Sequence, residues 1–491
     1  MCFISYLCKK YSAISGKYQE MTTQERLAHT IHSTEHVRLS EQIRLAFMLS
    51  LPAILSNLNN IVMDYIDTAM VGSLGANATA SIGLIATSTW MMGGVCSAVS
   101  SGFSVQVAHL FGAKKKKEAN DVLRQAFTAA LIFGSFLMIV GISISRQLPI
   151  WLGGNADIVE DAGIYFLVFV CSMPLMMVYM LLVGMLRCSG DMKLPSILSV
   201  IICAFDVVFN FFFIFPTREI SLLGWQFTCP GLGLGVLGAA LGTCTAWHLG
   251  ALYLIYHMCR KSKELRLDFK GKLLPENRVL KKALMIGSPI GLERIISCAA
   301  QITSTVIVAP LGTVAIAANA MGITIESLCY MPGYGIGEAA TTLIGQSLGA
   351  QRHDLIRKFA FIALGLGVAI MSLLAIVMYI TVPDLMSLMT PDIDVQQLTT
   401  RVLRIEAFAE PMFATSIICY SISVGMGDTL LPSIIQLGSI WLIRIPFAAL
   451  VASQWGLTGV WIAMASELCV RGVVMLIRMI KKTKKGLPSP P

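Results

Sequence analysis

The sequence predicts an all-α polytopic membrane protein with twelve transmembrane helices arranged as two six-helix lobes. Of its 491 residues, 55% are hydrophobic and only 13% are charged, against about 25% charged residues in ordinary soluble domains. The mean hydropathy is +0.72. Several runs of about 20 apolar residues can each cross a hydrocarbon core of about 30 Å. An internal repeat, in which the second half of the chain follows the first, predicts the two lobes.

The predicted helices follow one another with short connections. Residues 1–40 lack an apolar run long enough for a cleavable signal, so we expect a cytoplasmic leader. The first lobe covers residues 41–259, with helices predicted near 41–71, 80–111, 121–145, 163–186, 195–215 and 236–258. A longer loop, TREISLLGWQFTCPGLG, precedes the last of these. A basic linker at 260–282, a second lobe at 283–480 and a cytoplasmic tail at 481–491 complete the chain.

The second half repeats the first at a constant offset. Pro52 pairs with Pro289 and Gly75 with Gly312, and 289 − 52 = 312 − 75 = 237. The turn GDMKLPSI, from Gly190, matches GDTLLPSI, from Gly427, at the same offset. Because each half contains an even number of spans, both halves insert in the same orientation. The sequence therefore predicts parallel repeats about an axis along the membrane normal.

The positions of the basic residues indicate how the chain crosses the membrane. With the N-terminus inside, the basic loops all become cytoplasmic: 114–117, 187–193, 260–282, 352–358 and 481–485. The opposite loops hold only Arg146, Arg218 and Arg401 as basic residues. Both termini are therefore predicted to be cytoplasmic. The net charge of +9 is explained by these loops, and no nucleic-acid partner is expected.

A polar stripe runs along the first predicted helix. Asn57, Asn60, Asp64 and Asp67 are spaced by 3, 4 and 3 residues, which places them on one helical face. A carboxylate at the centre of a membrane helix costs about 2.5–3.5 kcal/mol on insertion scales, and such residues usually mark an ion or substrate pathway. The alternative is a buried acid that only hydrogen-bonds to neighbouring helices.

The sequence does not resemble an enzyme. No HExxH or P-loop motif occurs, and none of the seven histidines is placed beside a nucleophile as a base. The cysteines lack metal-binding spacing, and several lie in apolar runs where a thiol acts as a small hydrophobe.

Several motifs together resemble the MATE (multidrug and toxic compound extrusion) family, in particular its bacterial DinF-like branch. These are VMDYIDTAMVGSLG in the first helix, the GAKKKKEA and GAQRHDLIR loops, the paired GDxxxPS turns and the run VAPLGTVAIAANAMG. The resemblance implies two lobes around a V-shaped cleft and a secondary antiporter. It also implies export of amphipathic, often cationic drugs or metabolites in exchange for Na⁺ or H⁺.

The resemblance also implies a cation-coupling site in the first lobe. It maps the family's first-helix acid to Asp67 and the first-helix bend to Pro52. The family has Asn-x-x-x-Asp on its fifth helix, whereas this chain has Asp206 and Asn210 in exchanged positions. The i,i+4 spacing keeps both on one face. Thr243 matches the position on the sixth helix, and Asp64 and Asn60 complete the predicted set.

Two acids of the second lobe are secondary candidates. Another branch of the family keeps its cation acid at the position of Ser297, and Glu293 lies one turn earlier on the same face. The alternative for Glu293 is a pair with Arg294 or a capping role. Glu338 is the other candidate. The remaining intramembrane charges are candidates by default: Glu326, Glu406, Glu410, Glu467 and Arg444. Some of these acids are expected to form structural ion pairs with Arg404 or Arg444.

The predicted mechanism is alternating access. Desolvation and mutual repulsion should favour the protonated form of Asp67 and Asp206, while an oxygen-lined site could instead hold Na⁺. Cation binding would reshape the first helix at Pro52, where the missing N–H makes a bend cheap. A lipid-linked oligosaccharide flippase or a narrow-specificity metabolite exporter is the alternative. No cofactor is expected, the partners are small organic molecules and the lipid bilayer, and we expect a monomer in a bacterial inner membrane.

Overall fold

The computed structural model describes residues 21–33, 37–222, 225–262 and 264–484, which are almost entirely helical. After α2 (Thr23–His32), the first lobe contains α3 (Leu39–Gly72), α4 (Ala76–Gly112), α5 (Lys116–Ile144), α6 (Leu148–Trp151), α7 (Ala156–Cys171), α8 (Met173–Ser189), α9 (Lys193–Ile214), β1 (Pro216–Leu222), β2 (Trp225–Leu232) and α10 (Gly235–Arg260). The second lobe contains α11 (Asn277–Val308), η1 (Ala309–Leu311), α12 (Thr313–Gly349), α13 (His353–Met389), α14 (Ile393–Gly425), α15 (Leu430–Ser439), the π-helix η2 (Ile440–Arg444) and α16 (Ile445–Lys484).

Twelve membrane spans can be counted in the described chain. Ten helical segments are long and apolar enough to cross a membrane, and the bent pair α7 and α8 makes eleven. The last segment, Leu430–Lys484, has 55 residues and would be about 80 Å long if straight, far more than one span needs. It breaks at Gly456, whose φ of 59° and ψ of −145° are not helical. The segment therefore supplies two spans, as the sequence predicts.

The backbone confirms the internal repeat. The two described non-glycine residues with positive φ are Lys114 (59°) and Gln351 (58°), and 351 − 114 = 237. Glycines with positive φ recur at the same offset, in the pairs Gly75 and Gly312, and Gly190 and Gly427. Gly235 (56°) and Gly456 (59°) form a further pair at an offset of 221, where the longer loop of the first lobe has shifted the register. Equivalent turns thus connect equivalent helices in both lobes.

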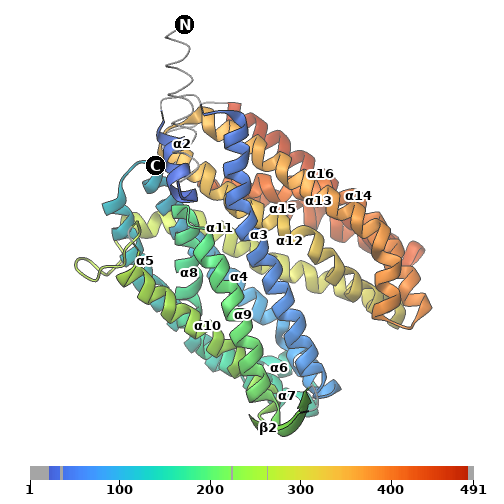
Figure 1. Ribbon diagram of the computed structural model, residues 1–491. Helices are drawn as coiled ribbons and strands as arrows, with labels where there is room; N and C mark the ends of the chain where they lie inside the picture. The colour runs from blue at the N-terminus through green and yellow to red at the C-terminus, as the bar shows by residue number, and fades with distance from the viewer. Residues whose placement is uncertain (1–20, 34–36, 223–224, 263, 485–491) are drawn as a thin grey trace, which may run out of the picture.

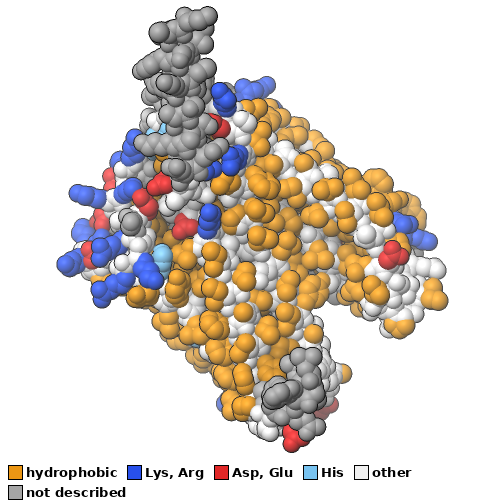
Figure 2. Space-filling model, viewed as in Figure 1, with side chains coloured by type: hydrophobic (Ala, Val, Ile, Leu, Met, Phe, Trp, Pro, Cys, Tyr) orange, Lys and Arg blue, Asp and Glu red, His pale blue; other side chains and the backbone are white. Residues whose placement is uncertain are grey.

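The two lobes diverge from a shared end, as the sequence-based resemblance implies. In Figure 1 the first lobe (blue to green) and the second (yellow to red) meet near α2 and separate toward the hairpin β1–β2. Figure 2 shows the hollow between their far ends and a surface of apolar side chains along both lobes. Lysines and arginines gather at the shared end, which we call the basic end.

Close backbone contacts join the lobes. Helix α12 packs against α3 and α4, and α11 packs against α4. A Cβ on Gly112 would lie 2.7 Å from the carbonyl carbon of Gln346, and one on Gly349 would lie 2.7 Å from that of His109. These contacts are reciprocal, because 346 − 109 = 349 − 112 = 237. The interface therefore follows the same repeat as the lobes.

The structure corrects two predicted elements. The loop before the sixth span is an antiparallel hairpin, in which Pro216 pairs with Leu232 and Leu222 with Trp225. The guanidinium carbon of Arg218 stacks 4.0 Å from the centre of the Phe215 ring and so holds the hairpin against the end of α9. The fourth span, predicted as one helix, is bent by 52° between α7 and α8. Pro174 weakens the helix here, because it has no N–H to donate to the preceding turn. The equivalent Pro411 lies inside unbroken α14, so the proline alone does not cause the break.

Other boundaries move by a few residues. Helix α11 begins at Asn277 and so includes the end of the predicted linker, and α16 extends to Lys484. Helix α2 lies within the predicted leader, where Thr22 and Glu25 form a capping box. The rest of the predicted tail, 485–491, lies outside the described residues.

Candidate cation-binding site

Three helices of the first lobe bring the main predicted residues together. Asp67 comes from α3, Asp206 and Asn210 from α9, and Thr243 from α10. Helix α9 packs along both α3 and α10, which is why its polar face meets side chains from both. Asp206 and Asn210 are fully buried, and Asp67 is partly exposed.

One amide bridges the two carboxylates. Asn210 donates from Nδ2 to Asp67 Oδ1 at 2.8 Å and to Asp206 Oδ2 at 3.2 Å. Asp206 is also close enough to Asp67 and Thr243 for side-chain hydrogen bonding. The exchanged order of acid and amide therefore still yields one compact cluster, because residues four apart on α9 share a face.

The cluster has spare oxygen acceptors and no basic partner. Asp206 Oδ1 and Asn210 Oδ1 are buried without a hydrogen-bond donor. Within the described chain, no lysine or arginine nitrogen lies within 4.0 Å of Asp67 or Asp206. A buried carboxylate without a partner needs a proton or a bound cation to neutralise it. Carboxylate, amide and hydroxyl oxygens are ligands that hard cations prefer.

The other predicted residues of α3 lie around this cluster. Asp64 is exposed and close enough to repel Asp67 and Asp206 electrostatically. Asn60 lies farther along the helix and accepts from Ser199 Oγ at 3.4 Å, so it contacts α9 away from the acids. Sequence reasoning missed Tyr165 of α7, which interacts electrostatically with all three acids.

Pro52 lies within α3, which remains one helix through it. Its carbonyl accepts a hydrogen bond from Ser196 Oγ at 2.6 Å, which ties this point of α3 to α9. On the other side, α12 approaches so closely that a Cβ on Gly335 would lie 2.6 Å from the backbone nitrogen of Ile54. The predicted bend point therefore lies between the first lobe and the second.

Glu293 is buried in a polar cluster of the second lobe. It accepts from Ser297 Oγ at 2.9 Å and from Gln436 Nε2 at 2.7 Å. Its second oxygen lies 3.8 Å from Arg294 Nε. The one-turn spacing to Ser297 is confirmed, and the alternative pairing with Arg294 is present as well.

Glu338 lies between the lobes. Its Oε1 is 2.5 Å from Nη1 of Arg187, and Arg187 also donates to Ser56 of α3 at 3.2 Å. Next to this pair, Thr342 donates to the carbonyl of Arg187 at 3.1 Å and Gln346 to that of Cys188 at 2.9 Å. Glu338 thus belongs to a group of contacts between α12 and α8 on the basic side of the cleft, which we call the tie.

A second group of acids is buried in the second lobe. Glu406 and Glu410 of α14 are fully buried, and none of their four carboxylate oxygens has a hydrogen-bond partner. Glu326 of α12 interacts electrostatically with both. Glu467, in contrast, forms the expected ion pair with Arg444, at 2.6 Å, and lies 3.2 Å from Arg471.

The two acidic groups do not occupy equivalent places in the repeat. Adding 237 to positions 67 and 206 gives Ser304 and Ile443, which carry no charge. Subtracting 237 from positions 406 and 410 gives Phe169 and Met173. The lobes therefore share a backbone plan while each carries its own buried acids.

Twelve spans in two repeated lobes around a cleft, with buried acids in each lobe, define a membrane transporter rather than an enzyme. The MatE family model matches residues 52–212 and 289–450. The chain therefore belongs to the MatE family. The two matched segments correspond to the two lobes.

Relatives and solved structures agree with this assignment. The chain is similar to the probable multidrug resistance protein NorM of Thermotoga maritima, with 27% identity over 87% of this chain and 90% of the relative. The corresponding protein of Neisseria meningitidis serogroup B is 24% identical over 89% and 93%. The assignment to the DinF-like branch stays a prediction.

Three solved structures share the fold. A MOP superfamily transporter from Pyrococcus furiosus has a TM-score of 0.84 at 19% identity, covering 94% of this chain and 98% of its own. The Vibrio cholerae MATE transporter VcmN in the bent form has a TM-score of 0.81 at 19% identity, with 91% and 98% covered. A MATE protein in the straight conformation has a TM-score of 0.83 at 19% identity, with 94% and 98% covered.

Proposed function

We propose that this protein is a cation-coupled antiporter that exports amphipathic organic cations. The observation that carries the proposal is the pair of carboxylates on α3 and α9 bridged by Asn210, with no basic partner in the described chain. Its similarity to proteins named as probable multidrug resistance proteins supports drugs or related metabolites as substrates. The exposed Asp64 beside the cluster favours a positively charged substrate.

The coupling ion is a proton or Na⁺. Two bridged acids can share one proton, because a second negative charge nearby disfavours ionisation of both. The free oxygens of Asp206 and Asn210, together with Asp67 and Thr243, could alternatively coordinate Na⁺. In either case the entering cation neutralises the acids that attract the substrate, so the two compete for the same charge.

Transport requires the tie at the basic end to open. The hollow between the lobes is open at the end away from α2 (Figure 2), and the contacts around Arg187 and Glu338 join the lobes toward the basic end. Alternating access would break this ion pair and close the opposite end. Related structures are described as bent and straight forms. We place the corresponding change of this chain in α3 at Pro52, where one backbone hydrogen bond is already missing.

The buried acids of the second lobe form a second candidate coupling site. Glu406 and Glu410 have four oxygens without donors, and burying unpaired charge is costly enough that each must carry a proton or meet a cation. Because both residues are fully buried in this conformation, any exchange with solvent would belong to another step of the cycle.

The first experiment measures export of a fluorescent organic cation from loaded cells or everted vesicles, with Na⁺ and proton gradients imposed separately. Wild type is compared with Asp67→Asn and Asp206→Asn, and with Asp268→Asn in the linker as a matched control. We expect gradient-dependent export in wild type and the control and its loss in both site variants.

Export that does not respond to either gradient, in correctly inserted protein, would reject the coupling mechanism. It would favour a lipid-linked oligosaccharide flippase or a narrow metabolite exporter instead. The acidic stripe on α3 argues against a cavity built for pyrophosphate. We further propose that the protein is a monomer in a bacterial inner membrane, with both termini cytoplasmic. Labelling of single cysteines at the two ends would test the orientation of the termini.

A further inference from the structure

A large groove lies on the second lobe, outside both acidic groups. It encloses about 1260 Å³ and is lined by α13, α14 and α16. Both α13 and α16 pack along α14 but hardly touch each other, so one face of α14 stays uncovered between them. Helix α12, which contacts the other lobe, also packs on α14. The groove therefore opens to the outer side of the lobe, toward lipid.

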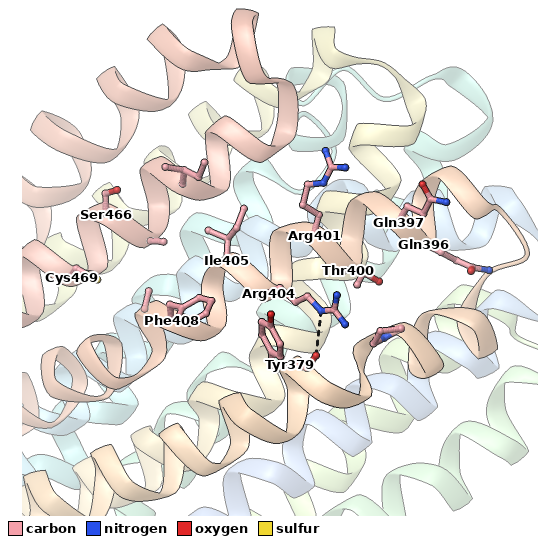
Figure 3. A pocket seen from close by; sticks show the side chains of 14 residues that line it. Tyr379, Gln396, Gln397, Thr400, Arg401, Arg404, Ile405, Phe408, Ser466 and Cys469 are labelled. Atoms are coloured by element: carbon pink, nitrogen blue, oxygen red, sulfur yellow. Dashed lines mark hydrogen bonds between the residues drawn. The ribbon is translucent and has the colours of Figure 1, made fainter.

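Two arginines lie in this groove, as Figure 3 shows. Arg404 donates to the carbonyl of Tyr379 at 3.4 Å, and its guanidinium carbon lies 5.0 Å from the centre of the Tyr379 ring. Arg401, one turn away, is exposed. Among the described residues, neither arginine forms an ion pair with a carboxylate. Asp392, at the start of the same helix, caps α14 by accepting from the backbone N–H of Asp394 at 3.0 Å.

The arginines lie within reach of the lipid headgroups. Helix α14 has 33 residues, so it is about 50 Å long and extends about 10 Å beyond each side of a 30 Å core if it is centred. Arg401 and Arg404 lie 8 and 11 residues after Ile393, which is about 12 and 17 Å along the helix. Both side chains can therefore reach the boundary between hydrocarbon and headgroups by extending outward.

The two parts of the groove match the two parts of a lipid. The outer part carries the arginines with Gln397 and Thr400, which supply hydrogen-bond donors to an anion. The inner part is apolar and includes Ile405 and Phe408, a residue that is 77% exposed. The volume exceeds that of most small-molecule pockets, which are about 300–1,000 Å³.

We propose that this groove binds an anionic phospholipid from the leaflet at the end away from α2. Arg401 and Arg404 hold the phosphate, because guanidinium groups form charge-assisted hydrogen bonds with phosphate oxygens. An acyl chain lies along Phe408 between α13 and α16. The lipid thereby supplies the anion that the protein does not and fills the gap between two helices that hardly touch.

The test measures retention of phosphatidylglycerol and phosphatidylcholine by the purified full-length protein, using native mass spectrometry and lipid-dependent shifts in thermal midpoint. The variant Arg401→Gln/Arg404→Gln is compared with Arg146→Gln, an exposed arginine of the first lobe predicted to lie at the same face. Each arginine near an anionic surface contributes about 1 kcal/mol to binding, so replacing both should lower the affinity for phosphatidylglycerol about 30-fold.

We expect wild type and Arg146→Gln to prefer phosphatidylglycerol equally and the double variant to lose that preference. Arg401 makes no described contact within the protein, so Arg401→Gln alone removes none and should lower phosphatidylglycerol affinity about fivefold. The single variant therefore gives a result even if the double variant folds poorly. Equal binding of phosphatidylglycerol by all variants, or equal retention of phosphatidylcholine, would overturn the proposal. Displacement of the lipid by soluble glycerol 3-phosphate would identify a free phosphate ligand and also overturn it. None of these outcomes depends on the coupling mechanism.

Discussion

The substitution Gly242→Ala tests whether Asn210 must be held between the two carboxylates. Gly242 lies on α10 directly before Thr243, and a Cβ there would lie 3.0 Å from both Cγ and the backbone nitrogen of Asn210. The added methyl group removes no polar atom, yet it must push the amide away from its position. The variant therefore perturbs the geometry of the cluster and leaves its charges unchanged.

The size of the expected effect follows from the hydrogen bonds that Asn210 loses when its amide is displaced. Asn210 donates two hydrogen bonds to carboxylates, at 2.8 and 3.2 Å, and one such bond to a charged group contributes about 1.5–3 kcal/mol. Overpacking of a buried contact costs about 1–3 kcal/mol by a separate route. Because 1.4 kcal/mol is tenfold, we expect the apparent affinity for the coupling ion to change about 10- to 100-fold. The affinity falls if the ion is Na⁺, because the amide oxygen moves out of the site, and rises if it is a proton, because carboxylates that lose a hydrogen-bond donor bind a proton more tightly.

The assay measures initial export rates of a fluorescent organic cation from loaded cells at graded external Na⁺ or pH. Gly83→Ala serves as the matched control, since a Cβ at Gly83 would meet nothing within 4 Å. Both variants are first checked for insertion and thermal midpoint. If Gly242→Ala shows the same ion dependence as wild type and the control, the amide bridge is not part of the coupling site.

Three further predictions concern the tie, the second-lobe acids and the bend. Arg187→Gln should weaken the contact with Glu338 by about 1–3 kcal/mol, between the values for exposed and buried ion pairs. The weaker contact should speed alkylation of the adjacent Cys188, measured by mass spectrometry, and an unchanged alkylation rate would contradict the prediction. Glu406→Gln should keep or raise the thermal midpoint, because it removes a buried acid without hydrogen-bond partners, while reducing the response of export to the ion gradient; an unchanged response would remove the second lobe from coupling. Pro52→Ala restores an N–H inside α3 and should raise stability by up to about 3 kcal/mol while slowing export; export at the wild-type rate would refute the bending step.

Much of the fold could be predicted because membrane helices leave a strong local signal. Apolar length located the spans, and the constant offset between halves located equivalent turns. The repeat paired Gly75 with Gly312 and Gly190 with Gly427, and the structure shows that all four glycines have a positive φ, which glycine adopts without strain.

The elements that sequence reasoning missed depend on contacts between segments. The hairpin is anchored by stacking of Arg218 on Phe211 and Phe215, which no local pattern announces. Arg444, the last residue of the π-helix at Ile440–Arg444, contacts Glu467 of α16, and no local pattern announces that contact either. The break before Pro174 had only a partial local signal, because Pro411 at the same place in the repeat lies inside unbroken α14.

The candidate site divides in the same way. Helical spacing alone placed Asp206 and Asn210 on one face, but their meeting with Asp67 depends on how α3 and α9 are rotated against each other. That rotation also decides which polar residues of α3 are left out, so Asn60 faces Ser199. Glu338 shows the limit most clearly. Its position on α12 marks it as an intramembrane acid, and only the docking of the lobes, which brings Arg187 to it, makes it part of a tie between them.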